Sequence, residues 1–246
     1  MKQLLKKFVP ISVRRAAHRL LELRAGHFAS LSYSQEGEDL VLRRLLEGRE
    51  SGFYVDVGAH HPWRFSNTFI FYQRGWRGMN IDATAEAIAR FHKARRRDIN
   101  VVAAVSSDGR ELTMRMFNEP ALNTLDPQQH TNLPEHFRVV SERKMQTRRL
   151  ADILKENLPA GQQIDFLSVD VEGMDLEVLR SNDWTRFRPR YVLCESLGQT
   201  AVEVADGPVS LFLAEQGYEF LAKTVHTAFY QIRAAQPDSA KGATHG

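Results

Sequence analysis

Three apolar segments of this chain each carry an aspartate at or near their end, and this repeated pattern narrows the folds that the chain can adopt. The segments are residues 53–57 with Asp56, residues 79–82 with Asp82, and residues 164–170 with Asp170. Their aromatic and β-branched residues favour buried strands. Because the carboxyl ends of parallel strands share one edge of a sheet, the three acids can converge on one crevice. Gly58 follows the first strand directly and leaves room for a ligand beside the backbone.

Strand patterns alternate with helical patterns from Phe53 to Gln216, and the chain then closes with an antiparallel pair over residues 218–222 and 226–233. This order predicts an α/β fold with an open, mostly parallel sheet and helices on both faces. Ser34 is expected to cap a helix that runs through Leu46. A third strand over residues 100–105 is expected to form a hairpin, through the turn at residues 107–109, with residues 112–117.

Residues 118–145 are polar, contain three prolines and show no clear periodicity. A segment of this length inside a compact domain is usually functional or disordered, so we expect it to form a lid over a bound substrate, which is called the acceptor below.

The basic charge of the chain is concentrated near its start. Residues 1–28 carry seven Lys or Arg residues against one Glu, a net charge of +6, whereas the whole chain carries +3. We therefore expect a basic helical arm over residues 1–33, a catalytic domain over residues 34–233 and a disordered tail over residues 234–246. The domain itself is slightly acidic, which argues against nucleic acid as a partner. The arm could contact a membrane surface, or it could pack on the domain.

The loop after the first strand suits a nucleoside cofactor without phosphates. A dehydrogenase would need Gly-x-Gly-x-x-Gly to admit a pyrophosphate, but here Gly58 is followed by Ala-His-His-Pro-Trp. The single glycine points to S-adenosylmethionine, and Asp82 is placed to accept hydrogen bonds from ribose hydroxyls. A nicotinamide-dependent oxidoreductase is disfavoured on the same ground.

Several linked motifs then resemble one known family. They are Ser34-Gln35-x-Gly37-x-Asp39, Phe53-Tyr54-Val55-Asp56-Val57-Gly58-Ala59, Ser66-Asn67-Thr68, Gly75-Trp76-Arg77-Gly78, Ala104-Val105-Ser106, and the run from Ile164 to Gly173. In this order, over roughly residues 34–196, they resemble the FkbM family of S-adenosylmethionine-dependent methyltransferases.

The resemblance implies a Rossmann-like class I methyltransferase fold with a seven-stranded, mostly parallel sheet, and O-methylation of a sugar, glycan or natural product. By position it assigns cofactor binding to Asp56, Gly58, Ala59 and Asp82, and it places Ala104, Val105 and Ser106 near the adenine. The arm and residues 118–145 lie outside the strong match, so the identity of the acceptor is not carried over.

Catalytic chemistry is expected at Asp170-Val171-Glu172-Gly173. Two residues apart on an extended segment, Asp170 and Glu172 point to the same side. Asp170 is our first choice for the general base or the group that positions the acceptor hydroxyl. The two acids could instead hold Mg²⁺ through hard oxygen ligands. Alternatively, Glu172 could only cap the following helix and pair with an arginine.

Other residues are also candidates for a role in the reaction. His60 could act as a base near neutral pH, and so could His61, although loop histidines are more often exposed or simply packed. His130 and His136 could touch the acceptor from the lid, and Glu195 could face the acceptor or pair with arginines. Trp63, Phe65 and Trp76 are expected to be core or loop anchors rather than platforms for a sugar.

The sequence thus predicts a methyltransferase that uses S-adenosylmethionine to methylate a hydroxyl. Its single cysteine, Cys194, fits a reducing compartment, and no segment of the sequence has the length of a membrane span. We therefore expect the cytoplasm, with peripheral membrane contact through residues 1–28 left open. The alternative is a non-catalytic scaffold with the same fold, recruited to a membrane or partner by the arm.

Overall fold

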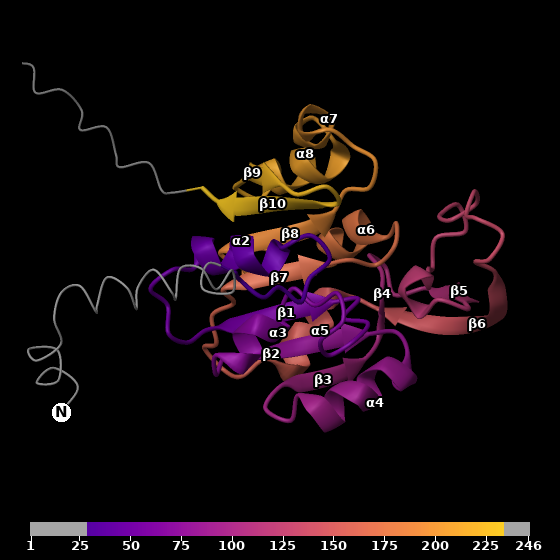
Figure 1. Ribbon diagram of the computed structural model, residues 1–246, viewed down its shortest axis with the longest axis horizontal. Coiled ribbons are helices and arrows are strands. Elements are labelled where there is room, and N and C mark those ends of the chain that lie inside the picture. The colour runs from indigo at the N-terminus through magenta and orange to yellow at the C-terminus, as the bar shows by residue number, and fades with distance from the viewer. Residues whose placement is uncertain (1–28, 234–246) are drawn as a thin grey trace, which may run out of the picture. The chain divides into compact units, whose positions relative to one another are not determined.

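The computed structural model describes residues 29–233 (Figure 1). The chain divides into two compact units, residues 1–32 and residues 33–246, and the helices and strands described below belong to the second. The predictions for the basic arm over residues 1–28 and for the tail beyond residue 233 lie outside the described residues. Among the helices that are described, none is both long enough and apolar enough to cross a bilayer.

A seven-stranded sheet forms the centre of this unit, in the order β3-β2-β1-β7-β8-β10-β9. Strands β3, β2, β1, β7 and β8 pair in parallel, while β10 is antiparallel to both β8 and β9. The strands are β1 (Phe53–Val57), β2 (Arg77–Asp82), β3 (Ile99–Val102), β7 (Phe166–Val169), β8 (Tyr191–Glu195), β9 (Tyr218–Lys223) and β10 (Thr227–Ile232). The predicted fold class is therefore confirmed, including its closing antiparallel pair.

Alternate side chains of β1 enter two different cores. Tyr54 packs in a cluster with Leu42 and Phe71, whereas Val55 packs in a cluster with Ile153 and Val178. Since successive side chains of a strand point to opposite faces, helices must cover both faces of the sheet. The helices are α2 (Glu38–Leu45), α3 (Phe69–Gln73), α4 (Ala85–Ala94), α5 (Leu150–Asn157), α6 (Asp175–Arg180), α7 (Ala201–Ala205) and α8 (Pro208–Glu215).

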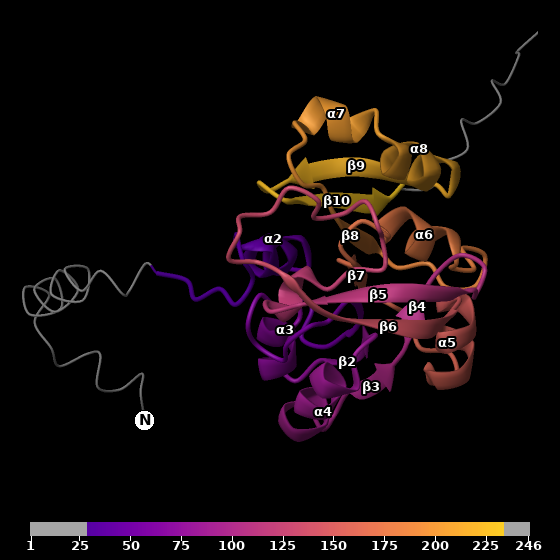
Figure 2. The same cartoon turned by 90° about the vertical axis from the view of Figure 1, so that its right-hand side faces the viewer.

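A small second sheet is visible beside the central sheet (Figure 2). Its order is β4-β6-β5, with β4 (Ala104–Val105), β5 (Glu111–Phe117) and β6 (Val139–Arg148). The predicted hairpin between residues 100–105 and 112–117 is wrong, because β6 pairs with both β4 and β5 and separates them. The predicted third strand is in fact two strands, β3 and β4. The backbone N–H of Ala103, which lies between them, still donates to the backbone carbonyl of Asp82, and the chain then leaves the central sheet.

The predicted lid is shorter than the sequence indicated. Residues 139–145 are part of β6, and a short 3-10 turn, η3 (Pro120–Leu122), lies within the remainder. The connection between β5 and β6 therefore runs over residues 118–138. The residue that precedes α2 is Gly37 and not Ser34, so the predicted cap position is wrong. The hydroxyl of Ser34 still accepts a hydrogen bond from the backbone N–H of Asp39 in the first turn, at 3.3 Å, and donates one to the Asp39 carboxylate.

Candidate active site

Two cavities meet at the carboxyl ends of β1, β2 and β7. The first has a volume of about 280 Å³ and extends beneath the second sheet, and the other has a volume of about 240 Å³ and reaches toward the end of β8. Both are lined by the same five residues at their junction: Gly58, His60, Ala121, Asp170 and Glu172. A group bound in one cavity can therefore meet a group bound in the other at these residues.

Asp82 lines the first cavity, and its carboxylate uses only part of its capacity to accept hydrogen bonds. Its Oδ1 accepts hydrogen bonds from the backbone N–H (2.8 Å) and the hydroxyl (2.7 Å) of Thr84. Its Oδ2 accepts one from the backbone N–H of His60, at 2.9 Å. A carboxylate has about four lone-pair sites, so Oδ2 can accept one more hydrogen bond from a ligand. This geometry fits the predicted contact with ribose hydroxyls.

The first cavity also has an apolar part suited to a flat ring. It is lined by Ala104 and Val105 from β4, by Met114 from β5 and by Leu125 from the loop that follows. Ser106 lines neither cavity. It is fully buried, and its hydroxyl shares a 2.6 Å hydrogen bond with the hydroxyl of Thr147. The structure therefore gives Ser106 a contact between β4 and β6 rather than one with the cavity.

Asp56 and Ala59 line the second cavity and are not among the residues that line the first. The carboxylate of Asp56 accepts a hydrogen bond from the hydroxyl of Thr68 at 2.9 Å. Burial raises the pKa of Asp56 to about 6, against the opposing effect of the Arg95 guanidinium. Of the cofactor-binding residues predicted in the loop after β1, only Gly58 lines both cavities.

Arg95 is a buried residue whose importance the sequence did not indicate. It follows α4 directly and precedes two further arginines, but its side chain is fully buried. Its guanidinium donates to the carbonyl of Pro62 (2.8 Å) and to the hydroxyls of Thr68 (2.7 Å) and Ser66 (2.7 Å). It thus holds the loop after β1 in place. The sequence offers no signal for this, because Arg95 stands among other basic residues.

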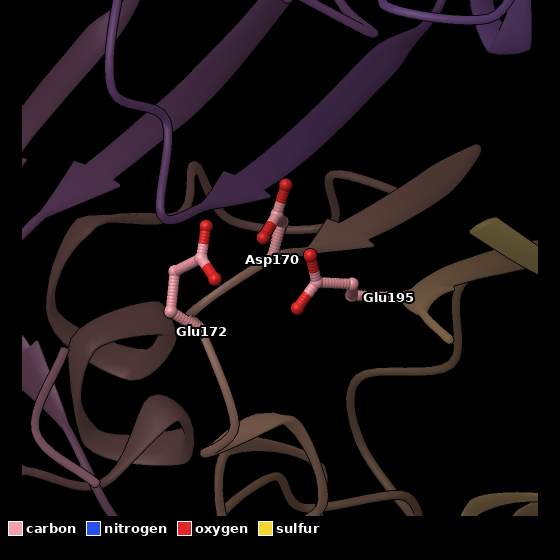
Figure 3. A group of neighbouring side chains, drawn as sticks. All are labelled: Asp170, Glu172 and Glu195. Atoms are coloured by element: carbon pink, nitrogen blue, oxygen red, sulfur yellow. The ribbon is translucent and has the colours of Figure 1, made fainter. Parts of the chain in front are cut away.

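Three carboxylates gather at the junction and the second cavity. Asp170 and Glu172 come from the turn after β7, and Glu195 comes from the end of β8 (Figure 3). One oxygen of each lies within 4.8 Å of one oxygen of the others. Asp170 is open to solvent through the cavities, but protein surrounds its carboxyl closely on the other sides, and this burial raises its pKa well above the usual range. Burial and the neighbouring acids also raise the pKa of Glu172 and of Glu195.

Glu172 neither caps α6 nor pairs with an arginine in the described structure. Met174 precedes that helix, and the ion pair of Glu172 is with His130, whose Nε2 lies 2.8 Å from Oε2 of Glu172. The structural alternative that the sequence left open for Glu172 is therefore wrong. Glu195 likewise forms no ion pair with an arginine among the described residues.

The histidines differ in their surroundings. His60 lines both cavities, its Nε2 is buried without a hydrogen-bond partner, and burial lowers its pKa, so it is neutral near pH 7. His61 accepts hydrogen bonds from the backbone at Arg64 and Trp63 and lines neither cavity. His130 lines the second cavity, whereas His136 does not.

The aromatic residues near the loop after β1 also differ. Trp76 is buried in the core, as expected. Phe65 is 43% exposed and lines the second cavity, so it is available to contact a ligand there.

Comparison with solved structures finds similar chains at low sequence identity. The METTL16 methyltransferase domain is 14% identical, with a TM-score of 0.44 over 78% of this chain, which spans 65% of that domain's length. A TehB-like S-adenosylmethionine-dependent methyltransferase from Corynebacterium glutamicum is 12% identical, with a TM-score of 0.40 over 92% of this chain and 100% of that one. The comparison with curated proteins finds no match.

The family model described as the methyltransferase FkbM domain matches residues 56–220, which is well over half of the chain. The matched range contains Asp56, Gly58, Asp82, Asp170 and Glu195. This family implies S-adenosylmethionine as the methyl donor, and the cavity beside Gly58 and Asp82 fits it. The chain belongs to the FkbM family of methyltransferases.

Proposed function

We propose that this protein transfers the methyl group of S-adenosylmethionine to a hydroxyl group of a sugar, a glycan or a related natural product. The observation that supports the proposal best is the second cavity, which joins the cofactor cavity at Asp170 and Glu172. Its lining offers hydrogen-bonding groups suited to hydroxyls, including the side chains of Gln35, Asn67 and Ser168.

The charge of the second cavity favours a neutral, hydroxylated acceptor. Among the described residues that line it, four are acidic and none is Lys or Arg. A phosphorylated or carboxylated acceptor would be repelled, whereas hydroxyl donors suit carboxylate acceptors. The exposed ring of Phe65 at the same cavity provides an apolar surface for the face of a sugar.

We assign the first cavity to S-adenosylmethionine, with Asp82 on the ribose, Ala104 and Val105 beside the adenine, and Gly58 at the junction. When bound, this donor supplies a methyl group on a positively charged sulfur. The acidic junction would attract that charge. The roles of Asp56, Ala59 and Ser106 in binding the cofactor remain predictions.

The protein's own task is to position the acceptor oxygen and to receive its proton. In-line displacement depends strongly on such positioning. We assign positioning to Asp170 and Glu172 at the junction. The oxygen–methyl bond forms as the sulfur–methyl bond breaks, and the hydroxyl proton passes to a base, for which Asp170 and the neutral His60 are the candidates. The Mg²⁺ ion considered from the sequence stays a proposal, with Asp170 and Glu172 as two of its ligands.

A screen with isotopically labelled S-adenosylmethionine tests the proposal. The purified chain is offered neutral sugars and glycans, sugar phosphates and uronic acids. Label recovered as a methyl ether on the neutral class supports it. Label on nitrogen or carbon, or transfer only to anionic sugars, would contradict it. A folded chain that binds no donor would favour the scaffold alternative, in which residues 1–28 contact a membrane or partner.

A further inference from the structure

Strained backbone positions of the described chain gather at the second cavity. Four non-glycine residues between positions 29 and 233 have a left-handed backbone, with φ between 52° and 59°: His60, Phe65, His130 and Glu172. All four line the second cavity. A left-handed backbone is unfavourable for a residue with a side chain, and residues held in this way cluster at active sites and ligand-binding sites. The strain therefore indicates a functional site at the second cavity, independently of the acids there.

Phe65 is the one apolar residue of the four. Histidine adopts the left-handed conformation more readily than most residues, whereas a bulky phenylalanine in this conformation is an outlier. Burial does not account for its presence, because Phe65 remains 43% exposed. Packing of the core therefore does not explain why a phenylalanine occupies this position.

Contacts on both sides of Phe65 hold its ring at the cavity. Arg64 donates to both carboxylate oxygens of Glu119, each at 3.1 Å, and its guanidinium carbon lies 4.3 Å from the centre of the Phe65 ring. The backbone N–H of Ser66 donates to the carbonyl of Tyr33 at 2.9 Å. Because a ring has two faces, Arg64 can cover only one of them. The ring is thus fixed in position and keeps exposed surface for a ligand.

The rest of the second cavity offers the polar groups that a ring-shaped sugar needs beside an aromatic surface. Phe65 is the only Phe, Tyr or Trp among the described residues that line it. Gln35 and Asn67 offer hydrogen-bond donors and acceptors to hydroxyls, and Asp170 and Glu172 offer acceptors. A pyranose has a patch of C–H bonds on its face and hydroxyls around its edge. The electron-rich face of an aromatic ring attracts such C–H groups.

We propose that Phe65 is the specificity-determining residue of the acceptor site: its ring stacks on the C–H face of a pyranose and selects ring sugars over open-chain polyols. The inference rests on the proposed function and narrows its acceptor class to compounds that present a pyranose ring. The sequence indicated an anchor at Phe65, and the exposed ring at the cavity is the reason for the different assignment. Stacking leaves the hydroxyls at the edge of the sugar free to meet Asp170 and Glu172 at the junction.

Ligand-observed NMR titration tests the stacking role of Phe65 on the full chain without donor. The probes are methyl β-D-galactopyranoside, whose ring presents a C–H face, and galactitol, an open-chain polyol without the ring. Each probe is titrated into the natural protein, Phe65→Asn and Phe65→Tyr. Asparagine tolerates the left-handed backbone, so Phe65→Asn removes the ring without adding strain, whereas Phe65→Tyr keeps an aromatic ring.

The matched control is Trp63→Asn. Trp63 belongs to the same loop and is 49% exposed, but it lines neither cavity. Its replacement therefore removes an exposed aromatic side chain without changing the second cavity. Circular dichroism checks that each variant is folded.

We expect the natural protein to bind the pyranoside more tightly than galactitol. Phe65→Asn should bind the pyranoside about threefold to tenfold more weakly, whereas Phe65→Tyr and Trp63→Asn should retain the natural affinity. Natural affinity in Phe65→Asn would overturn the proposal. The same conclusion would follow if the folded natural chain bound no pyranoside, or bound both probes equally.

This binding test does not depend on methyl transfer, which is measured on the same protein with labelled S-adenosylmethionine. Label recovered as a methyl ether, while Phe65→Asn binds the pyranoside with natural affinity, would remove only the role of Phe65. Binding of the pyranoside that depends on Phe65, in a chain that transfers no methyl group, would remove only the proposed function.

Discussion

Gly58 and Asp170 lie so close together that a methyl group added at Gly58 would overlap the backbone carbonyl oxygen of Asp170. The two residues follow adjacent parallel strands, and the backbone N–H of Asp170 donates to Val57 at 3.0 Å. This contact sets the junction of the two cavities. The loop proposed to hold the donor and the turn proposed to hold the acceptor are thus fixed to each other through backbone atoms.

Gly58→Ala should therefore lower stability and donor affinity together. Gly109→Ala is the matched control, because Gly109 also has a positive φ (70° against 81°) but a Cβ there meets only ordinary contacts. The left-handed conformation alone costs about 1–2 kcal/mol, so Gly58→Ala should cost clearly more than Gly109→Ala. Thermal unfolding measures the difference, and equal melting temperatures in the two variants would contradict the close contact.

Arg95→Met should destabilise the protein strongly. Removing the guanidinium leaves the buried carbonyl of Pro62 and two buried hydroxyls without their donor. Loss of one partner from a buried charged network costs about 3–5 kcal/mol. Arg96→Met, which changes the exposed neighbour, is the control. Urea unfolding at neutral pH gives both values, and a similar small loss in the two variants would count against the network.

Asp56 should make the protein less stable as pH rises from about 4 to about 6. The folded chain holds the Asp56 proton with a pKa of about 6, above the ordinary 3.8, so folding takes up a proton in this range. The free energy of unfolding then falls with rising pH, by at most about 3 kcal/mol from this group. Asp56→Asn removes this contribution.

Denaturation of the natural protein and Asp56→Asn at pH 4.5 and pH 7 tests the prediction. The variant should gain stability relative to the natural protein at the higher pH. A gap between the two proteins that does not change with pH would show that Asp56 keeps an ordinary pKa.

Asp170→Asn should reduce turnover far more than donor affinity. The substitution keeps the size of the side chain but removes the charge that we assign to positioning the acceptor hydroxyl. General acid–base or positioning roles contribute about 100-fold or more to rate. The measurement compares kcat with the acceptor found by screening against the dissociation constant of S-adenosylmethionine. Equal losses in both quantities would contradict an acceptor role for Asp170.

The strand-terminal acids were predictable because each follows a short apolar run that can only be a buried strand. Strands β1, β2 and β7 therefore lie near their predicted bounds, and Asp82 and Asp170 lie at the expected edge. Strand β6 was missed, because most of its residues are exposed and polar and its hydrogen bonds come from pairing with β5. Local sequence carries little information about such a partner-dependent strand.

The acid cluster was predictable only in part. Asp170 and Glu172 are close in sequence, but Glu195 joins them because β8 pairs beside β7, and His130 reaches Glu172 from the loop between β5 and β6. Both contacts depend on tertiary packing. The buried position of Arg95 was hidden for the same reason, since neighbouring arginines at the end of α4 have the same local sequence signal.

Calorimetric binding of S-adenosylmethionine to the natural chain, Asp82→Asn and Asp170→Asn tests the central claim most directly. We expect the natural chain and Asp170→Asn to bind the donor with similar affinity. Asp82→Asn should bind about tenfold or more weakly, because a hydrogen bond to a charged group is worth about 1.5–3 kcal/mol. Asp108→Asn, at an exposed acid, should change nothing. A folded natural chain that binds no donor, or full affinity in Asp82→Asn, would contradict the assignment of the first cavity.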